Sequence, residues 1–221
     1  MKITYIEHSA FLIETQHQLL LFDYAQGKLP ALPAHKPLYV FVSHAHADHY
    51  APIIYHIKHP AITYLLSADI ATSYPHLSLR PHEHYEVDGL SFTTLASTDE
   101  GVAFDIQCEE GRLYFAGDLN WWDWGEEDSL AESLAMKEAY IREMERLVDT
   151  HYRVAFVPVD PRLKQHALKG LHTFLRYAQS DVVIPMHFWQ DSTIFSVLKK
   201  DRSLHTQKLW TNFQKLETFS I

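Results

Sequence analysis

Three histidines and one aspartate lie within six residues in the segment His44-Ala45-His46-Ala47-Asp48-His49. The apolar run at residues 37–42, directly before it, predicts a buried strand. Side chains at the end of a strand rest on a rigid support yet face a loop, which is where functional sites are usually built. Imidazole and carboxylate together bind zinc, manganese or iron. The segment therefore predicts a metal site, the alternative being a solvated His-rich loop.

The rest of the chain predicts strands in its first half and alternating strands and helices in its second half. We expect strands at residues 3–7, 11–15, 18–22, 62–66, 91–96, 102–107, 112–116, 154–157, 182–184 and 215–219. We expect helices at residues 52–58, from Ser129 onward, at 165–178 and at 192–199. This order favours an α/β chain with two sheets packed face to face and helices outside. At 221 residues, we expect a single domain over 1–221.

Two of the predicted helices carry an apolar face. Ser129 and Glu132 have the spacing of a capping box, which predicts the start of the first of these helices. Apolar residues then recur at helical spacing at Leu130, Leu134, Ile141, Met144 and Val148. In the helix at 165–178, the apolar positions are Leu168, Leu171 and Leu175. We expect both faces to pack against the core.

Composition narrows the classes of partner. The chain has 19 Lys and Arg against 28 Asp and Glu, a net charge of −9, so a nucleic acid is not expected. A small anionic substrate stays open, because bound metal cations would reverse the local field. Cys108 is the single cysteine, which fits a reducing compartment. With no signal-peptide pattern and no membrane-spanning apolar run, we expect a cytoplasmic protein without membrane contact. The sequence does not indicate an oligomeric state.

The motif at residues 44–49 resembles the signature of the metallo-β-lactamase superfamily. The similarity continues at three other places, each at or beyond the end of a predicted strand: Leu20-Leu21-Phe22-Asp23, Phe115-Ala116-Gly117-Asp118 and Pro185-Met186-His187-Phe188. The resemblance implies the four-layered αββα sandwich of two mixed β-sheets. Histidine and serine after the first strand also resemble the branch that contains ascorbate-phosphate lactonases and related small hydrolases.

The resemblance also implies a ligand set. His44 and His46 would hold a first metal ion. A second metal ion would be held by Asp48, His49 and His187. Asp118 would lie between the two ions. Asp48 would in addition be catalytic by orienting the nucleophile. Asp23 would support the ligand loops through hydrogen bonds. We expect one or two divalent ions, zinc first, with manganese or iron as alternatives.

One departure from the superfamily concerns the first metal. A third histidine normally comes from the loop that is residues 96–101 here, and this loop has none. Asp99 is the best candidate to replace it, ahead of Glu100 and Thr98. A carboxylate is a harder donor than imidazole, so it would move the preference from zinc toward manganese or iron. Otherwise Asp99 only caps the turn, and the first metal is weak or absent.

Further residues are candidates for the walls of the substrate pocket. His8 either lines the site or is an ordinary histidine at a strand end. Asp160 either faces the cleft or forms a turn between prolines. The tryptophans next to the ligand loops, Trp121, Trp122, Trp124 and Trp189, form an apolar cleft wall or cover the core.

The function implied by the resemblance is metal-dependent hydrolysis. A metal-bound hydroxide would attack an ester-like bond of a small substrate: a phosphodiester, lactone, thioester or amide. One alternative is a nuclease of the same superfamily, which the net charge and the short chain disfavour. Another is a metal-binding regulator without turnover. The missing histidine supports the regulator, and the presence of Asp48 and Asp118 counts against it.

Overall fold

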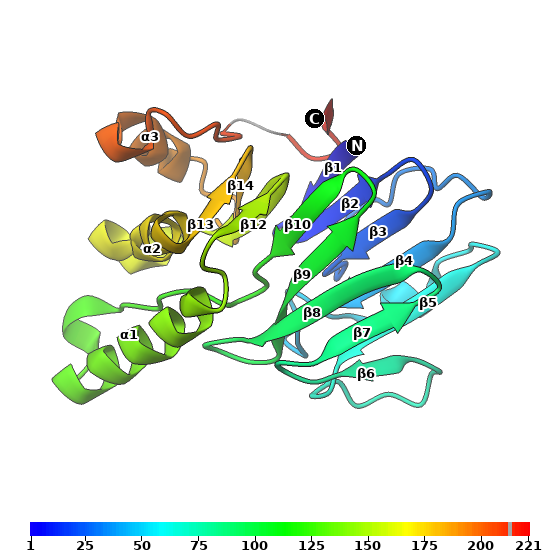
Figure 1. The fold of residues 1–221 in the computed structure, drawn as a ribbon, viewed down its shortest axis with the longest axis horizontal. Helices are drawn as coiled ribbons and strands as arrows, with labels where there is room; N and C mark the ends of the chain where they lie inside the picture. The colour runs from blue at the N-terminus through cyan, green and yellow to red at the C-terminus, as the bar shows by residue number, and fades with distance from the viewer. Residues whose placement is uncertain (212–213) are drawn as a thin grey trace.

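Two large β-sheets lie face to face, and the α-helices lie on the outer side of the second sheet (Figure 1). This computed structural model describes residues 1–211 and 214–221. Within them, the first sheet has seven strands in the order β15-β1-β2-β3-β4-β5-β6. Their bounds are Lys2–Glu7 (β1), Ala10–Glu14 (β2), Leu19–Phe22 (β3), Leu38–Val42 (β4), Ile62–Ser67 (β5), Leu77–Leu79 (β6) and Thr218–Ser220 (β15).

The second sheet has six strands in the order β14-β12-β10-β9-β8-β7 within the same described residues. Their bounds are His84–Val87 (β7), Leu90–Ala96 (β8), Val102–Cys108 (β9), Gly111–Phe115 (β10), Val154–Pro158 (β12) and Val183–Met186 (β14). A small pair beside this sheet consists of Thr150–Tyr152 (β11) and Ala178–Ser180 (β13). Both large sheets are mixed, since each combines antiparallel pairs with parallel pairs.

The helices differ in length and type. The α-helices are Leu130–Glu145 (α1), Lys169–Tyr177 (α2) and Thr193–Lys200 (α3), and the 3-10 helices are Pro52–His56 (η1), Gly125–Glu127 (η2), Pro161–His166 (η3) and Arg202–Leu204 (η4). No helix in the described ranges is both long and apolar enough to cross a membrane.

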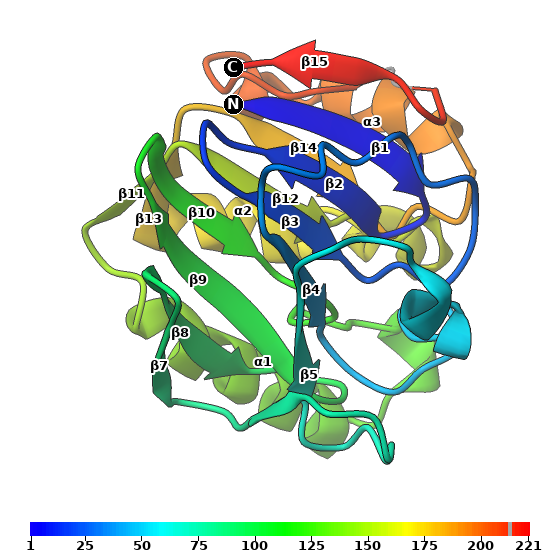
Figure 2. The same cartoon turned by 90° about the vertical axis from the view of Figure 1, so that its right-hand side faces the viewer.

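The first sheet is apolar on both faces at β3 and β4, because every residue of these two strands is aliphatic or aromatic and buried. On β3, Leu20 and Phe22 pack into the core between the sheets, whereas Leu19 and Leu21 pack into a second cluster on the outer face. Successive side chains of a strand point to opposite faces, so a continuous apolar run requires cover on both sides. The outer cover is η1 with its loops, and Figure 2 shows the first sheet on one side of the molecule with the α-helices on the other.

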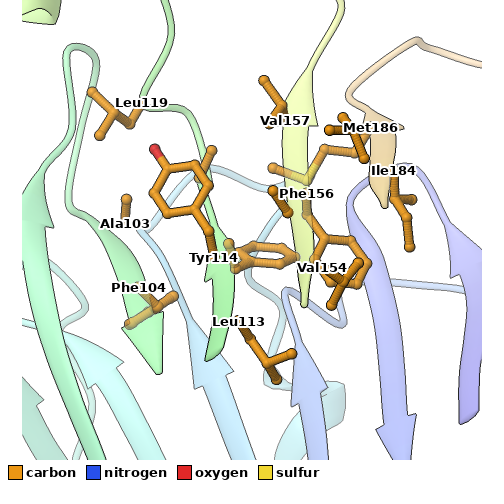
Figure 3. Packing of buried hydrophobic residues seen from close by; sticks show 14 of the residues in the cluster. Ala103, Phe104, Leu113, Tyr114, Leu119, Val154, Phe156, Val157, Ile184 and Met186 are labelled. Atoms are coloured by element: carbon orange, nitrogen blue, oxygen red, sulfur yellow. The ribbon is translucent and has the colours of Figure 1, made fainter. Parts of the chain in front are cut away.

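The core of the second sheet is built from three neighbouring strands. Figure 3 shows Leu113 and Tyr114 on β10, Phe156 on β12, and Ile184 and Met186 on β14 among the apolar side chains of this cluster. All five are almost completely buried. Because β10, β12 and β14 pair in parallel, their carboxyl ends lie at the same edge of the sheet.

The predicted pair of mixed sheets is confirmed, and the helical layer on the first sheet is thinner than expected. The predicted helix at 52–58 is the short 3-10 helix η1, which begins at Pro52. The predicted helix at 165–178 starts as an α-helix only at Lys169. The strands β6, β7, β11 and β13 were not predicted, because each has only three or four residues.

The apolar face predicted for the first long helix is wrong over most of its length. The capping box of Ser129 and Glu132 is present, so α1 starts as expected. Leu130 is nevertheless 78% exposed, and Leu134 and Val148 are exposed as well. Tyr140 and Met144 are among the buried residues, all of which lie in the second half of the helix. The helix face that is covered therefore depends on where α1 meets the rest of the chain, which helical spacing does not encode.

Candidate metal centre

The predicted site residues share one kind of position, just beyond the carboxyl end of a strand. They follow seven strands: His8 after β1, Asp23 after β3, the motif 44–49 after β4, Asp99 after β8, Asp118 after β10, Asp160 after β12 and His187 after β14. Within each sheet, these strands run in the same direction. Residues far apart in sequence therefore meet at one end of the sandwich.

We call the first group, His8, Asp48, His49 and His187, the buried half of the centre. One ligand atom from each lies within 4.8 Å of the others. His8 Nε2 lies 3.1 Å from Asp48 Oδ2, and His49 Nε2 and His187 Nε2 lie 3.6 and 3.7 Å from the same oxygen. The three histidines are almost completely buried, as expected for side chains that line an interior site.

We call the second group, His44, His46 and Asp118, the exposed half, because the His46 side chain is 43% exposed. Asp118 joins the two halves. Its Oδ2 lies 3.6 Å from His44 Nε2, and its Oδ1 lies 3.2 Å from His49 Nε2 and 3.5 Å from His187 Nε2. This is the position that the sequence analysis predicted for Asp118, although its role as a ligand stays a prediction.

Buried atoms without partners test whether these residues fit a metal. Among the described residues, His44 Nε2, His49 Nε2 and Asp118 Oδ1 are buried and have no hydrogen-bond partner. Leaving such an atom unsatisfied costs about 1–3 kcal/mol. A metal ion bound among these three atoms would explain why they lack hydrogen-bond partners, because each atom could donate a lone pair to the ion. The residues therefore fit the metal that the sequence predicts.

Hydrogen bonds orient the histidines for this purpose. His49 Nδ1 donates to Asp23 Oδ2 at 2.7 Å, and His187 Nδ1 donates to Asp160 Oδ2 at 3.1 Å. Ser43 Oγ donates to Asp23 Oδ2, so His44 Nδ1 donates to Ser43 Oγ. In each neutral ring, the lone pair is then on Nε2, the nitrogen that faces the centre.

Charge balance explains the protonation expected without metal. Burial lowers the pKa of His49, but the Asp118 and Asp23 carboxylates outweigh burial and raise it to about 10. For Asp118, burial raises the pKa, and His49 and His187 outweigh it and hold the pKa well below its usual range. Protons therefore occupy the place of the metal cations in the metal-free protein.

Asp23 and Asp160 each accept a hydrogen bond from the Nδ1 of a candidate ligand histidine, on the side away from the metal centre. Asp23 is fully buried and also accepts a hydrogen bond from the Ser43 backbone N–H at 2.8 Å, as predicted for a residue that holds the ligand loops. Of the two alternatives for Asp160, the structure has the turn: the carboxylate accepts from the Arg162 backbone N–H at 2.9 Å at the start of η3. Asp160 is fully buried and does not line the cavity, because its carboxylate also accepts from the side chains of His187, Arg162 and Trp189.

Gly117, within the Gly-Asp turn, allows two ligand loops to approach each other. A Cβ at Gly117 would lie 2.6 Å from Ser43 Cβ, and the residue has a φ of +52°. A Cβ at Gly101 would lie only 2.0 Å from the Ser43 carbonyl oxygen. Side chains at either position would displace the segment that carries His44.

The loop that lacks the third histidine still faces the exposed half. Asp99 Oδ2 lies 3.7 Å from His46 Nδ1, and Glu100 Oε2 lies 3.5 Å from His46 Nε2. Burial raises the pKa of Asp99, and the nearby Asp118 raises it further. Asp99 does not belong to the group of ligand atoms within 4.8 Å, so its role as a ligand stays a prediction.

A cavity of about 420 Å³ opens above the centre. Its lining combines ligand candidates with aromatic side chains and one arginine: His46, Asp48, Thr98, Asp99, Asp118, Trp122, Trp124, Met136, Arg162, His187 and Trp189. Trp189 lines the cavity, and its contact with a substrate stays a prediction. Trp121 does not line the cavity, because it packs against the core near Tyr140 instead. His8 lies behind the cavity, with its ring centroid 4.5 Å from the centroids of His187 and Trp189.

Arg162 and Met136 line the cavity although the sequence did not indicate them as site residues. Arg162 is two residues from Asp160 and beyond the end of β12, which is the signal that could have identified it. Met136 lies on α1, and only the position of that helix brings it to the cavity.

Comparisons with known proteins agree with this geometry. A beta-lactamase superfamily domain matches residues 2–123, which is more than half of the chain. A UPF0173 metal-dependent hydrolase of Desulforamulus reducens is 36% identical over 74 residues, which is 32% of this chain and 32% of that protein. The matched segment therefore spans about a third of that relative.

Solved structures share the fold. Igni18, a metallo hydrolase of Ignicoccus hospitalis, superimposes with a TM-score of 0.67 at 18% identity, over 100% of this chain and 98% of that chain. CmlA, a diiron beta-hydroxylase of Streptomyces venezuelae, gives a TM-score of 0.66 at 10% identity, over 100% of this chain and 54% of that chain. With the domain match and the two-sheet architecture, these findings show that the chain belongs to the beta-lactamase superfamily.

Proposed function

We propose that this protein is a metal-dependent hydrolase that cleaves an ester-like bond in a small molecule. One observation carries the proposal: buried, unpartnered atoms of His44, His49 and Asp118 converge beneath an open cavity with aromatic walls. A structural zinc site is usually closed by four Cys or His ligands, whereas this centre is rich in carboxylates and faces a cavity. This difference favours catalysis over a purely structural or regulatory metal.

The residues divide between two metal positions. His44, His46 and Asp118, with Asp99 as the candidate for the missing ligand, would hold the first ion. Asp48, His49, His187 and Asp118 would hold the second ion, with His8 beside them. When bound, the metals supply Lewis acidity that lowers the pKa of water and stabilises negative charge on oxygen.

The protein side chains contribute position and exclusion of water. Asp48 lines the cavity and is within hydrogen-bonding distance of His8, so its carboxylate is held in one orientation and can accept a proton from a nucleophilic water. Trp122 and Trp189 form apolar walls beside the ligands. Such walls exclude bulk water and strengthen electrostatic interactions at the reacting bond.

Several finer features belong to the same proposal. A cavity of about 420 Å³ is within the range of small-molecule sites. The net charge of −9 disfavours a nucleic acid as the substrate. We propose zinc as the resident metal, with manganese or iron favoured at the first position if Asp99 is a ligand. We also propose a cytoplasmic location, on the basis of the single cysteine.

The test combines metal analysis with a substrate panel. Protein purified without a metal-affinity tag is assayed for bound metal, then for hydrolysis of phosphodiester, lactone, thioester and amide substrates with added zinc or manganese. His49→Ala should lose metal and activity, whereas His205→Ala, at an exposed position directly after η4, is the matched control. No turnover in any class by metal-replete protein would reject the proposal.

A further inference from the structure

Arg162 brings a positive charge to the cavity wall opposite a set of acidic side chains. In the described part of the chain, no other Lys or Arg lines this cavity, whereas Asp48, Asp99 and Asp118 all do. The Arg162 side chain is 49% exposed, so a ligand in the cavity can reach it.

Two kinds of contact fix the guanidinium group. Nε and Nη2 donate to the buried Asp160 carboxylate, at distances of 2.9 and 2.5 Å from Oδ2. The group also stacks on Trp189, 4.6 Å from the ring centroid, and lies 5.6 Å from that of Trp124. Nη1 donates to no acceptor within residues 1–211 and 214–221. A guanidinium held in this way keeps donor capacity for a ligand at little entropic cost.

The surrounding charges favour an anion over a cation. The guanidinium already occupies the faces of Trp189 and Trp124, so these rings are not available as a cage for a cationic substrate. The acidic ligands, Asp48 and Asp118, would be neutralised by bound metal. The bound metal ions would then add positive charge at the floor of the cavity, and Arg162, held by Asp160, is the Lys or Arg that the described residues place on its wall.

We propose that Arg162 binds an anionic group of the substrate, a carboxylate or a phosphate, and thereby selects anionic esters with an apolar portion. The fork of a guanidinium matches the oxygens of either group. Trp122 and Met136 line the same cavity and offer apolar contacts for the rest of the molecule. The inference rests on the proposed hydrolase function for its substrate class, but the anion site itself can be measured by binding.

The binding experiment uses zinc-loaded protein and three probes of similar shape: phenylacetate, phenylphosphonate and the neutral phenylacetamide. Calorimetry should show tighter binding of at least one anion than of the amide in the wild type. Arg162→Met should weaken anion binding on the order of tenfold, which is the loss of one charge-assisted hydrogen-bonding partner. The two anions separate a carboxylate preference from a phosphate preference.

The matched control is Lys164→Met. Lys164 lies two residues after Arg162, its charged side chain is exposed, and it does not line the cavity. Its affinities should stay close to those of the wild type. Equal affinity of the wild type for the amide and both anions would overturn the proposal. An unchanged preference for anions in Arg162→Met would also overturn the proposal, because the metal ions and not Arg162 would then cause the preference.

Kinetics separate substrate binding from support of His187 through Asp160. The substrates are neutral 4-nitrophenyl butyrate and anionic mono-4-nitrophenyl glutarate. Arg162→Lys and Arg162→Met should raise KM for the anionic ester and lower the anionic-to-neutral ratio of kcat/KM, with kcat changed less than KM. An equal fall of kcat for both esters would overturn the role in selectivity. If the wild type hydrolyses neither ester, hydrolysis of these esters is not supported, while the binding result still decides the role of Arg162.

Discussion

The two halves of the metal centre differ in how firmly the fold holds their side chains. In the buried half, His49 and His187 are buried, and each has a carboxylate behind it, Asp23 or Asp160. In the exposed half, the His46 side chain is half-exposed; it lies near Asp99, Glu100 and the His44 ring, and no carboxylate of the described residues holds it from a buried position as Asp23 holds His49. Preformed ligands lose less conformational entropy when they bind a metal. We therefore expect the buried half to bind its ion more tightly.

The largest effect should follow removal of the carboxylate that the halves share. Asp118→Ala deletes the group between His44, His49 and His187. We expect loss of metal from both positions and a fall in kcat/KM of more than about a hundredfold, beyond the range for residues that only support ligands. Metal content per chain and steady-state rates measure this. Two ions retained per chain would show that the halves do not depend on this carboxylate.

The supporting carboxylates should distinguish the halves. Asp160→Asn disturbs the hydrogen bond to His187 alone among the ligands and should weaken the buried position by about 10- to 100-fold. Asp23→Asn should weaken both positions, because Asp23 holds His49 directly and His44 through Ser43. Titration of metal-free protein with zinc would measure both affinities. A weakening of the two positions by Asp160→Asn to the same degree would contradict the separation.

A smaller effect is expected at the exposed half. Asp99→Ala should weaken the first position severalfold and leave the position of His49 and His187 nearly unchanged. Glu100→Ala is the matched comparison, since Glu100 also approaches His46 but does not line the cavity. Identical titration curves for the wild type and Asp99→Ala would refute a ligand role. Asp99→His should move the preference toward zinc, because imidazole is the softer donor.

The sequence predicted the site residues that lie in local motifs, and it did not predict those whose contacts depend on the fold. The motif at 44–49 was found because its ligands are adjacent in the chain and follow an apolar strand. Asp118 and His187 were found from their resemblance to known motifs, and both also follow apolar strands. Arg162 had no such motif, and its contacts with Trp124 and Trp189 come from segments that only the fold brings together.

Long-range placement also explains the predictions that were wrong. Asp160 follows a strand like the ligands do, yet its carboxylate is covered by His187 and Trp189, which lie 27 and 29 residues away in the sequence. On α1, apolar spacing was present, but the first half of the helix leaves Leu130 in solvent. Local pattern predicts which elements form and where they end. Which face is covered, and which carboxylate is buried, depends on neighbours that are distant in sequence.

The smallest effect concerns protons in the metal-free protein. Burial lowers the pKa of His49, but Asp118 and Asp23 outweigh it and raise it to about 10, against about 6.5 in the unfolded chain. A folded-state pKa above the unfolded value gives stability that is complete below pH 6.5 and is lost as pH rises toward 10. The Tm of chelator-treated protein should therefore fall by several degrees between pH 6 and pH 10. With zinc bound the fall should be smaller, because the metal replaces the proton. His49→Ala should reduce this difference between metal-free and zinc-loaded protein without abolishing it, because burial lowers the pKa of His187, but Asp118 and Asp160 outweigh burial and raise it well above its usual value. His46→Ala should preserve the difference, since His46 belongs to the exposed half. If His46→Ala reduced the pH dependence of the Tm as much as His49→Ala, the contrast between the buried half and the exposed half would be wrong.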